Sequence, residues 1–138
     1  MYKSARLVPL IVFLASMLIS FTTGTSWGTF AIMMPIAVPL AYKLSGGLGP
    51  EVIASIAAVF GGGIFGDHCS PVSDTTVLSS SFTSCDRIDH VVTQLPYAVT
   101  AACVGIILYI LFLLGFTNGI AFLGLGVVLL VIAHYLLS

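Results

Sequence analysis

The sequence predicts an all-α transmembrane protein, and three observations lead to this fold class. Of its 138 residues, 59% are hydrophobic and only 7% are charged, whereas soluble domains carry about 25% charged residues. The apolar stretches are of the length that helices need to cross a membrane, about 20 residues each. The remaining polar residues gather where glycine and proline interrupt these stretches. A net charge of −1 with no basic run excludes nucleic-acid binding, and membrane lipid is the expected surrounding.

The first apolar region covers residues 7–42 and is interrupted by TTGTSWGT at residues 22–29. Two geometries fit this region, one long broken helix or a re-entrant helical hairpin with the polar segment at its tip. We favour the hairpin, because a polar turn between two short apolar arms is what a tip at membrane depth requires. The arms are then about 15 and 13 residues long, or about 20 Å each if helical.

The second region, residues 51–81, predicts a broken membrane helix. Glu51 begins it after a glycine- and proline-rich loop, and its charge suits a helix N-terminus. Ser73 or Asp74 is expected to cap a second half-helix. The interruption contains residues that disfavour a continuous helix: Gly61, Gly62, Gly63, Gly66 and Pro71. We place the break between Asp67 and Ser73.

The rest of the chain predicts an aqueous loop followed by two transmembrane helices. Residues 82–90 include two aspartates and an arginine, which favours a position outside the bilayer. Residues 91–115 and 118–137 are long apolar runs separated by an Asn-Gly turn. The whole chain, residues 1–138, is thus expected to form a single membrane domain.

Asp67 is the strongest candidate for an ion-binding residue. It follows a helix, at the end that carries partial negative charge, so an ionised carboxylate is disfavoured there. Such an aspartate needs either a proton or a compensating cation, and ionisable groups at membrane depth mark ion or substrate paths. We therefore expect Asp67 to bind a sodium ion or a proton in exchange. A hydrated loop aspartate at the membrane surface is the alternative.

Other polar residues of the two interruptions are candidates to share this site. Asp74 is either an ionised helix cap or an ion ligand, and His68 is either a proton relay or a packed or capping histidine. Neutral oxygen ligands are offered by Thr25, Ser26, Thr29, Ser70, Ser73, Thr75 and Thr76. Each hydroxyl alone is as easily explained by a bond back to its own helix. As a group, they predict that the two interruptions face each other across a water-filled pocket.

An enzyme is not expected. Asp67 and Asp74 are seven residues apart and lack the Gly-x-Gly-Asp motif of intramembrane aspartyl proteases. Zinc is disfavoured, because adjacent His68 and Cys69 rarely reach one ion together. No cofactor is implied.

The segments TTGTSWGTFAIMMPIA, GGGIFGDHCSPVSDTTVLSS and CDRIDHVVTQLPYA together resemble the C-terminal half of the NhaC family of sodium/proton antiporters. This resemblance implies two inverted repeats, each with a re-entrant hairpin followed by a broken helix. Sodium ions and protons would be the transported ions. An integral protein of a bacterial or archaeal plasma membrane is then expected. The family also includes exchangers that couple sodium and protons to malate and lactate.

The length of the chain corresponds to about one repeat of such a transporter. The other wall of the ion site would come from a missing N-terminal half or from self-association. The alternative from another functional class is a non-transporting membrane subunit or a truncated remnant.

Overall fold

The structure is a computed structural model that describes residues 2–137, and these residues form six helices and no strand. In chain order they are α1 (Tyr2–Thr23), α2 (Ser26–Ser45), α3 (Pro50–Cys69), α4 (Asp74–Phe82), α5 (Arg87–Leu113) and α6 (Gly119–Leu137). By length and composition, α1, α2, α3 and α5 can each cross a membrane, and the apolar part of α6, Gly119–Tyr135, is shorter. The predicted all-α transmembrane fold is confirmed.

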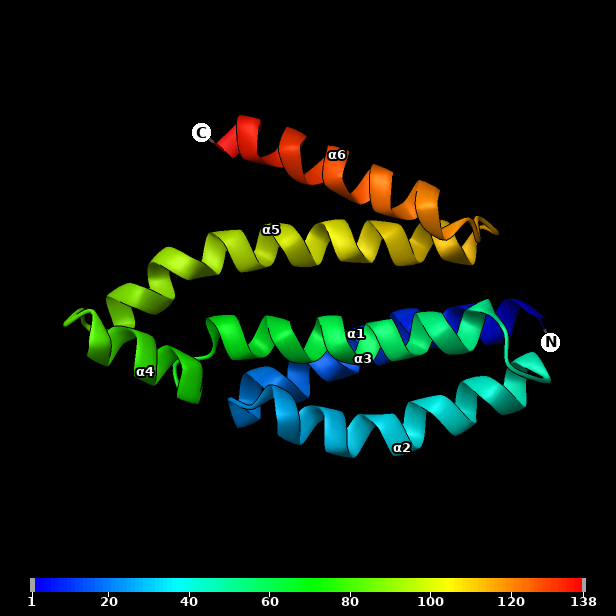
Figure 1. Ribbon diagram of the computed structural model, residues 1–138, viewed down its shortest axis with the longest axis horizontal. Coiled ribbons are helices and arrows are strands. Elements are labelled where there is room, and N and C mark those ends of the chain that lie inside the picture. The colour runs from blue at the N-terminus through cyan, green and yellow to red at the C-terminus, as the bar shows by residue number, and fades with distance from the viewer. Residues whose placement is uncertain (1, 138) are drawn as a thin grey trace.

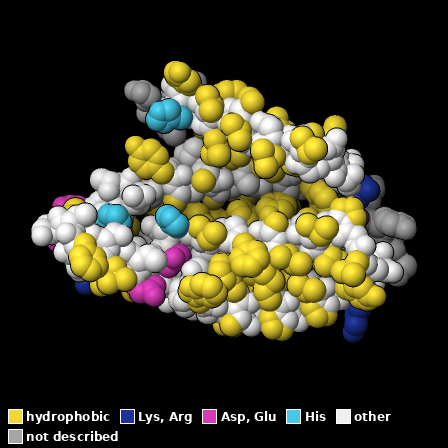
Figure 2. All heavy atoms as spheres, viewed as in Figure 1, with side chains coloured by type: hydrophobic (Ala, Val, Ile, Leu, Met, Phe, Trp, Pro, Cys, Tyr) yellow, Lys and Arg dark blue, Asp and Glu magenta, His cyan; other side chains and the backbone are white. Residues whose placement is uncertain are grey.

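The helices α1, α2 and α3 form a packed unit, and α5 and α6 lie along one side of it. Figure 1 shows α1 and α2 as an antiparallel hairpin and α3 beside both, with α5 alongside α3 and α6 outermost. Aliphatic side chains and Phe13 fill the core between α1, α2 and α3. Figure 2 shows hydrophobic side chains over the middle of one face, with the acidic side chains near the end where α4 lies.

The hairpin is tighter and its arms are longer than the sequence suggested. Only Gly24 and Thr25 separate α1 from α2, and Gly24 takes a positive φ of 70° that favours glycine. Thr25 caps α2 by accepting a hydrogen bond from the Gly28 amide at 3.3 Å. The arms contain 22 and 20 residues, about 30 Å each, so the expected arm lengths were wrong. Whether the hairpin is re-entrant stays a prediction.

The glycines before Asp67 belong to the helix, which continues to Cys69 rather than ending before Asp67. Residues 61–63 and Gly66 lie within α3, where they allow α1 to approach closely. A Cβ on Gly62 would lie 2.6 Å from the Ser16 Cβ, and one on Gly66 would lie 2.2 Å from the Phe21 backbone nitrogen. Small residues four apart on facing helices are the usual means of close packing in membranes.

The break itself covers residues 70–73, between α3 and α4. Asp67 is therefore in the last turn of α3 rather than in the break. Pro71 lacks an amide hydrogen and cannot extend the α3 ladder. Ser73 takes the N-cap position of the nine-residue helix α4, and Asp74 is its first residue. The predicted aqueous loop at 82–90 is also shorter, because Asp86 caps α5 and residues 87–90 already belong to that helix.

Candidate functional site

The tip of the hairpin meets the break after α3. A Cβ on Gly24 would lie 2.7 Å from the Val72 carbonyl oxygen, so only glycine fits this contact. The hydroxyl of Ser70 donates to the carbonyl oxygen of Phe21, with 2.7 Å between the oxygens. The prediction that the two interruptions face each other is confirmed. A water-filled pocket between them stays a prediction.

Asp67 is buried at this junction, with 8% of its surface exposed. Its Oδ1 accepts a hydrogen bond from the Ser73 hydroxyl at 2.7 Å, and its Oδ2 lies 3.4 Å from the Ser26 hydroxyl, which donates to it. The hydroxyl of Thr75 donates to the backbone carbonyl of Asp67 at 3.0 Å and lies 2.8 Å from the Ser73 hydroxyl. We call Asp67, Ser26, Ser73 and Thr75 the Asp67 cluster. It joins the end of α3, the beginning of α2 and the beginning of α4.

The electrostatic surroundings of Asp67 leave its charge uncompensated by any basic side chain. Among the side chains of residues 4–135, the ion pair within 4.0 Å is that of Arg6 with Glu51, at 3.8 Å, and both of those residues lie at the other end of α1 and α3. The C-terminal end of α3 carries partial negative charge and the N-terminal end of α4 partial positive charge. An uncompensated charge is very costly in a buried position, so this arrangement suits a site where a cation approaches the carboxylate.

Three of the predicted hydroxyls lie outside the Asp67 cluster and are bonded elsewhere. Thr25 caps α2, and the buried Thr29 donates to the Thr25 carbonyl at 2.9 Å. Ser70 is used in the contact with Phe21. These bonds fix the shape of the tip and of the break, which is how the three residues position the Asp67 cluster.

The other predicted residues differ in their surroundings. Thr76 is 2% exposed, and its hydroxyl has no hydrogen-bond partner within the described residues. It lies in the first turn of α4, next to Thr75 in the sequence. Asp74 is exposed at the start of α4. His68 is also exposed, and its Nδ1 lies 3.0 Å from the Ile64 carbonyl oxygen.

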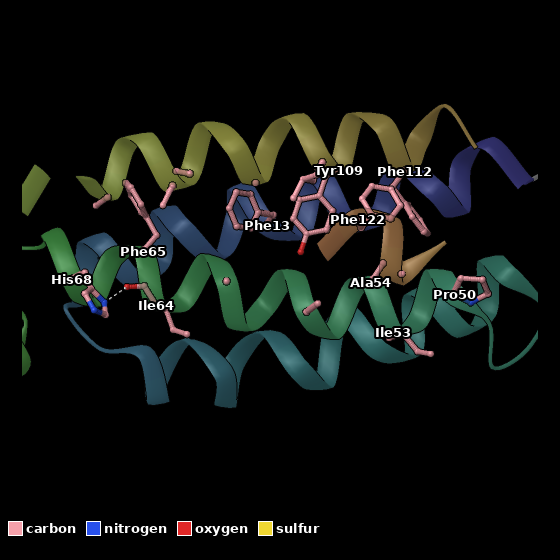
Figure 3. A pocket seen from close by; sticks show the side chains of 18 of the residues that line it. Phe13, Pro50, Ile53, Ala54, Ile64, Phe65, His68, Tyr109, Phe112 and Phe122 are labelled. Atoms are coloured by element: carbon pink, nitrogen blue, oxygen red, sulfur yellow. Dashed lines mark hydrogen bonds between the residues drawn. The ribbon is translucent and has the colours of Figure 1, made fainter. Parts of the chain in front are cut away.

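His68 lines a separate cavity of about 850 Å³ between α3 and α5. Figure 3 shows Phe13 and Tyr109 reaching into this cavity, with His68 at one end. The sequence did not point to this cavity, because its walls are apolar helix faces like those that meet lipid. Ser20 was also missed: its hydroxyl donates to the carbonyl of Gly63 and ties α1 to α3. Its spacing of four from Ser16, on an apolar helix, was the available signal.

Comparisons with known proteins agree with this architecture. The family model described as "Na+/H+ antiporter family" matches residues 1–114. An uncharacterized protein of Haemophilus influenzae is 49% identical over 118 residues, which are 84% of this chain and 22% of that protein. The malate-2H(+)/Na(+)-lactate antiporter of Bacillus subtilis is 36% identical over 105 residues, 73% of this chain and 22% of that protein.

An uncharacterized Na(+)/H(+) antiporter of Haemophilus influenzae is 33% identical over 94 residues, 65% of this chain and 19% of that protein. The chain spans about a fifth of the length of these curated relatives. No solved structure gives a significant match. The resemblance drawn from the sequence segments is confirmed, and the chain belongs to the Na+/H+ antiporter family.

Proposed function

We propose that this chain forms one wall of the ion site of a sodium/proton antiporter, with Asp67 as the residue that alternately binds the two ions. The observation that carries the proposal is the buried Asp67 carboxylate, surrounded by hydroxyl oxygens and without a basic partner in the described residues. Carboxylate, hydroxyl and carbonyl oxygens are ligands that hard cations accept. The other wall is expected from the rest of a longer transporter or from a second chain.

The exchange follows from the competition of two ions for one carboxylate. With sodium bound, the ion offsets the negative charge, and Ser26 and Ser73 turn their oxygen lone pairs toward the ion. When a proton replaces sodium, Asp67 becomes a neutral acid and its O–H donates to one of these hydroxyls. Because a bare carboxylate is disfavoured at this position, release of one ion requires binding of the other.

The test uses a full-length relative that carries these residues in place of its own. The 118 matching residues of this chain would replace those of the Haemophilus influenzae relative that is 49% identical. In everted vesicles, sodium addition should then dissipate a preformed proton gradient. Asp67→Asn should abolish this response, whereas Asp74→Asn is the matched control at an exposed aspartate seven residues away and should retain it. Sodium-driven proton movement by the Asp67→Asn chimera would refute the proposal.

Exchange of organic anions is the second candidate, since the Bacillus subtilis relative is named as a malate/lactate antiporter. The N-termini of α2 and α4 meet at the site, and helix N-termini favour carboxylate groups. The same vesicles distinguish the two candidates. A proton response that needs malate or lactate together with sodium would favour the anion exchanger. A chimera that inserts but shows neither response would favour the non-transporting subunit.

A further inference from the structure

The cavity between α3 and α5 is a groove that follows the length of α3. Its lining runs from Pro50 to His68 on α3 and from Gln94 to Phe112 on α5. Nineteen residues of helix span about 28 Å, close to the hydrocarbon thickness of a bilayer, about 30 Å. The occupant that matches this shape is itself an element that crosses the membrane.

The two walls of the groove present small residues at matching intervals. Ala54 and Ala57 stand on α3, and Ala98 and Ala101 stand on α5, three residues apart in each case. The floor between them is the ring of Phe13 from α1, which lies close to glycines of both helices. Small side chains on two facing walls allow the backbone of a third helix to approach closely, as in most membrane helix contacts.

A polar group in the middle of the groove distinguishes a protein partner from a lipid tail. The Tyr109 ring lies 5.1 Å from the ring of Phe13, which stands halfway along α1. Tyr109 is half-buried, and its hydroxyl makes no hydrogen bond within residues 4–135, although a tyrosine hydroxyl in apolar surroundings usually finds a partner. An acyl chain has no acceptor to offer, whereas a helix can present a serine or threonine hydroxyl or a freed carbonyl.

We propose that this groove receives a transmembrane helix from the part of the full-length transporter that lies outside these 138 residues, and that this helix carries a hydrogen-bonding group opposite Tyr109. Two further observations favour that source. The relatives are several times longer than this chain. Within this chain, only 17% of the apolar stretch of α5 is buried against the other helices. The inference rests on the proposed function in one respect, that the chain works as part of a larger antiporter.

The test measures whether lipid enters the groove. Cys69→Ala, Cys85→Ser and Cys103→Ser remove the native cysteines, and Ala101→Cys places a bimane label on the α5 wall. The label is then quenched by brominated phosphatidylcholine in vesicles that hold either the 138-residue chain alone or the full-length chimera. The matched control keeps the native Cys103, which is exposed on α5 outside the groove. A second label at Ala57→Cys on the α3 wall provides an independent measurement of quenching.

In vesicles of the chain alone, the labels at Ala101→Cys, Ala57→Cys and Cys103 should be quenched alike, because lipid fills the empty groove. In the chimera, both groove labels should lose most of their quenching. Equal quenching of the groove labels in chain and chimera would identify lipid as the occupant and overturn the proposal. Protection in the chain alone that increases with protein-to-lipid ratio would identify a second copy and also overturn it. Because the readout is lipid contact, a chimera without sodium transport still gives a clear answer here.

Discussion

Gly66→Ala tests whether the close approach of α1 and α3 holds the site together. A Cβ at this position would lie 2.2 Å from the Phe21 nitrogen, 2.3 Å from the Ser20 carbonyl carbon and 2.5 Å from the Ser20 hydroxyl oxygen. Two of these atoms belong to the backbone, so no side-chain rotation relieves the contact. To reach ordinary contact at 3.4 Å, the helices would have to separate by about 1.2 Å.

That separation also breaks hydrogen bonds between the two helices. The 2.7 Å bond from Ser70 to the Phe21 carbonyl and the bond from Ser20 to the Gly63 carbonyl both cross this interface. Overpacking of a close contact costs about 1–3 kcal/mol, and each hydrogen bond between membrane helices contributes about 0.6 kcal/mol. We expect Gly66→Ala to lower the free energy of unfolding by about 2–4 kcal/mol.

The assay is unfolding of the chain by SDS titration in mixed micelles, with the fluorescence of Trp27 at the hairpin tip as the readout. Gly124→Ala is the control, because a Cβ on Gly124 in α6 would meet nothing within 4 Å. Alanine is the better helix former by about 1 kcal/mol, so the control should be neutral or stabilising. The reasoning is refuted if Gly66→Ala unfolds at the same SDS midpoint as the wild type, or if Gly66→Ala and Gly124→Ala lose the same amount of stability.

The remaining predictions concern the cluster and the opposite end of the bundle. Ser73→Ala should lower the apparent sodium affinity of the chimera about tenfold or more, because a hydrogen bond to a charged group contributes about 1.5–3 kcal/mol. The control is Ser79→Ala on the exposed face of α4, which should leave the sodium affinity unchanged in the same flux assay. Asp74→Ala should cost at most about 1 kcal/mol of stability, because an exposed acid in a first turn contributes only through the helix dipole, and a larger loss in SDS titration would contradict this. Arg6→Gln should destabilise the chain more than the double variant Arg6→Gln with Glu51→Gln does. The reason is that the single change leaves the buried Glu51 carboxylate without its partner. A double variant as unstable as the single variant would show that this ion pair does not explain the loss of stability.

The sequence was sufficient to predict the helical membrane fold, the junction of two interruptions and the central position of Asp67. Composition alone determines the fold class, and a helix-terminal aspartate beside hydroxyl residues stands out in any apolar chain. The packing role of Gly62 and Gly66 could not be predicted from the sequence. A glycine in an apolar run is compatible with a break or with a close helix contact, and only the position of α1 decides between them. For the same reason, the local bonds of Thr25 and Thr29 were not separable from ligand roles.

The contacts between the hairpin tip and the break have a mechanical consequence. Three bonds connect the hairpin with α3 and the break after it, from Ser20 to Gly63, from Ser70 to Phe21 and from Ser26 to Asp67. A tip that moved outward on its own would lose all three bonds. In the antiporter proposed above, the tip and the two half-helices would therefore move together, and the hinge would lie at the border of this unit. The four-residue connection between α4 and α5, where Ser84 takes a positive φ of 53°, forms one such border.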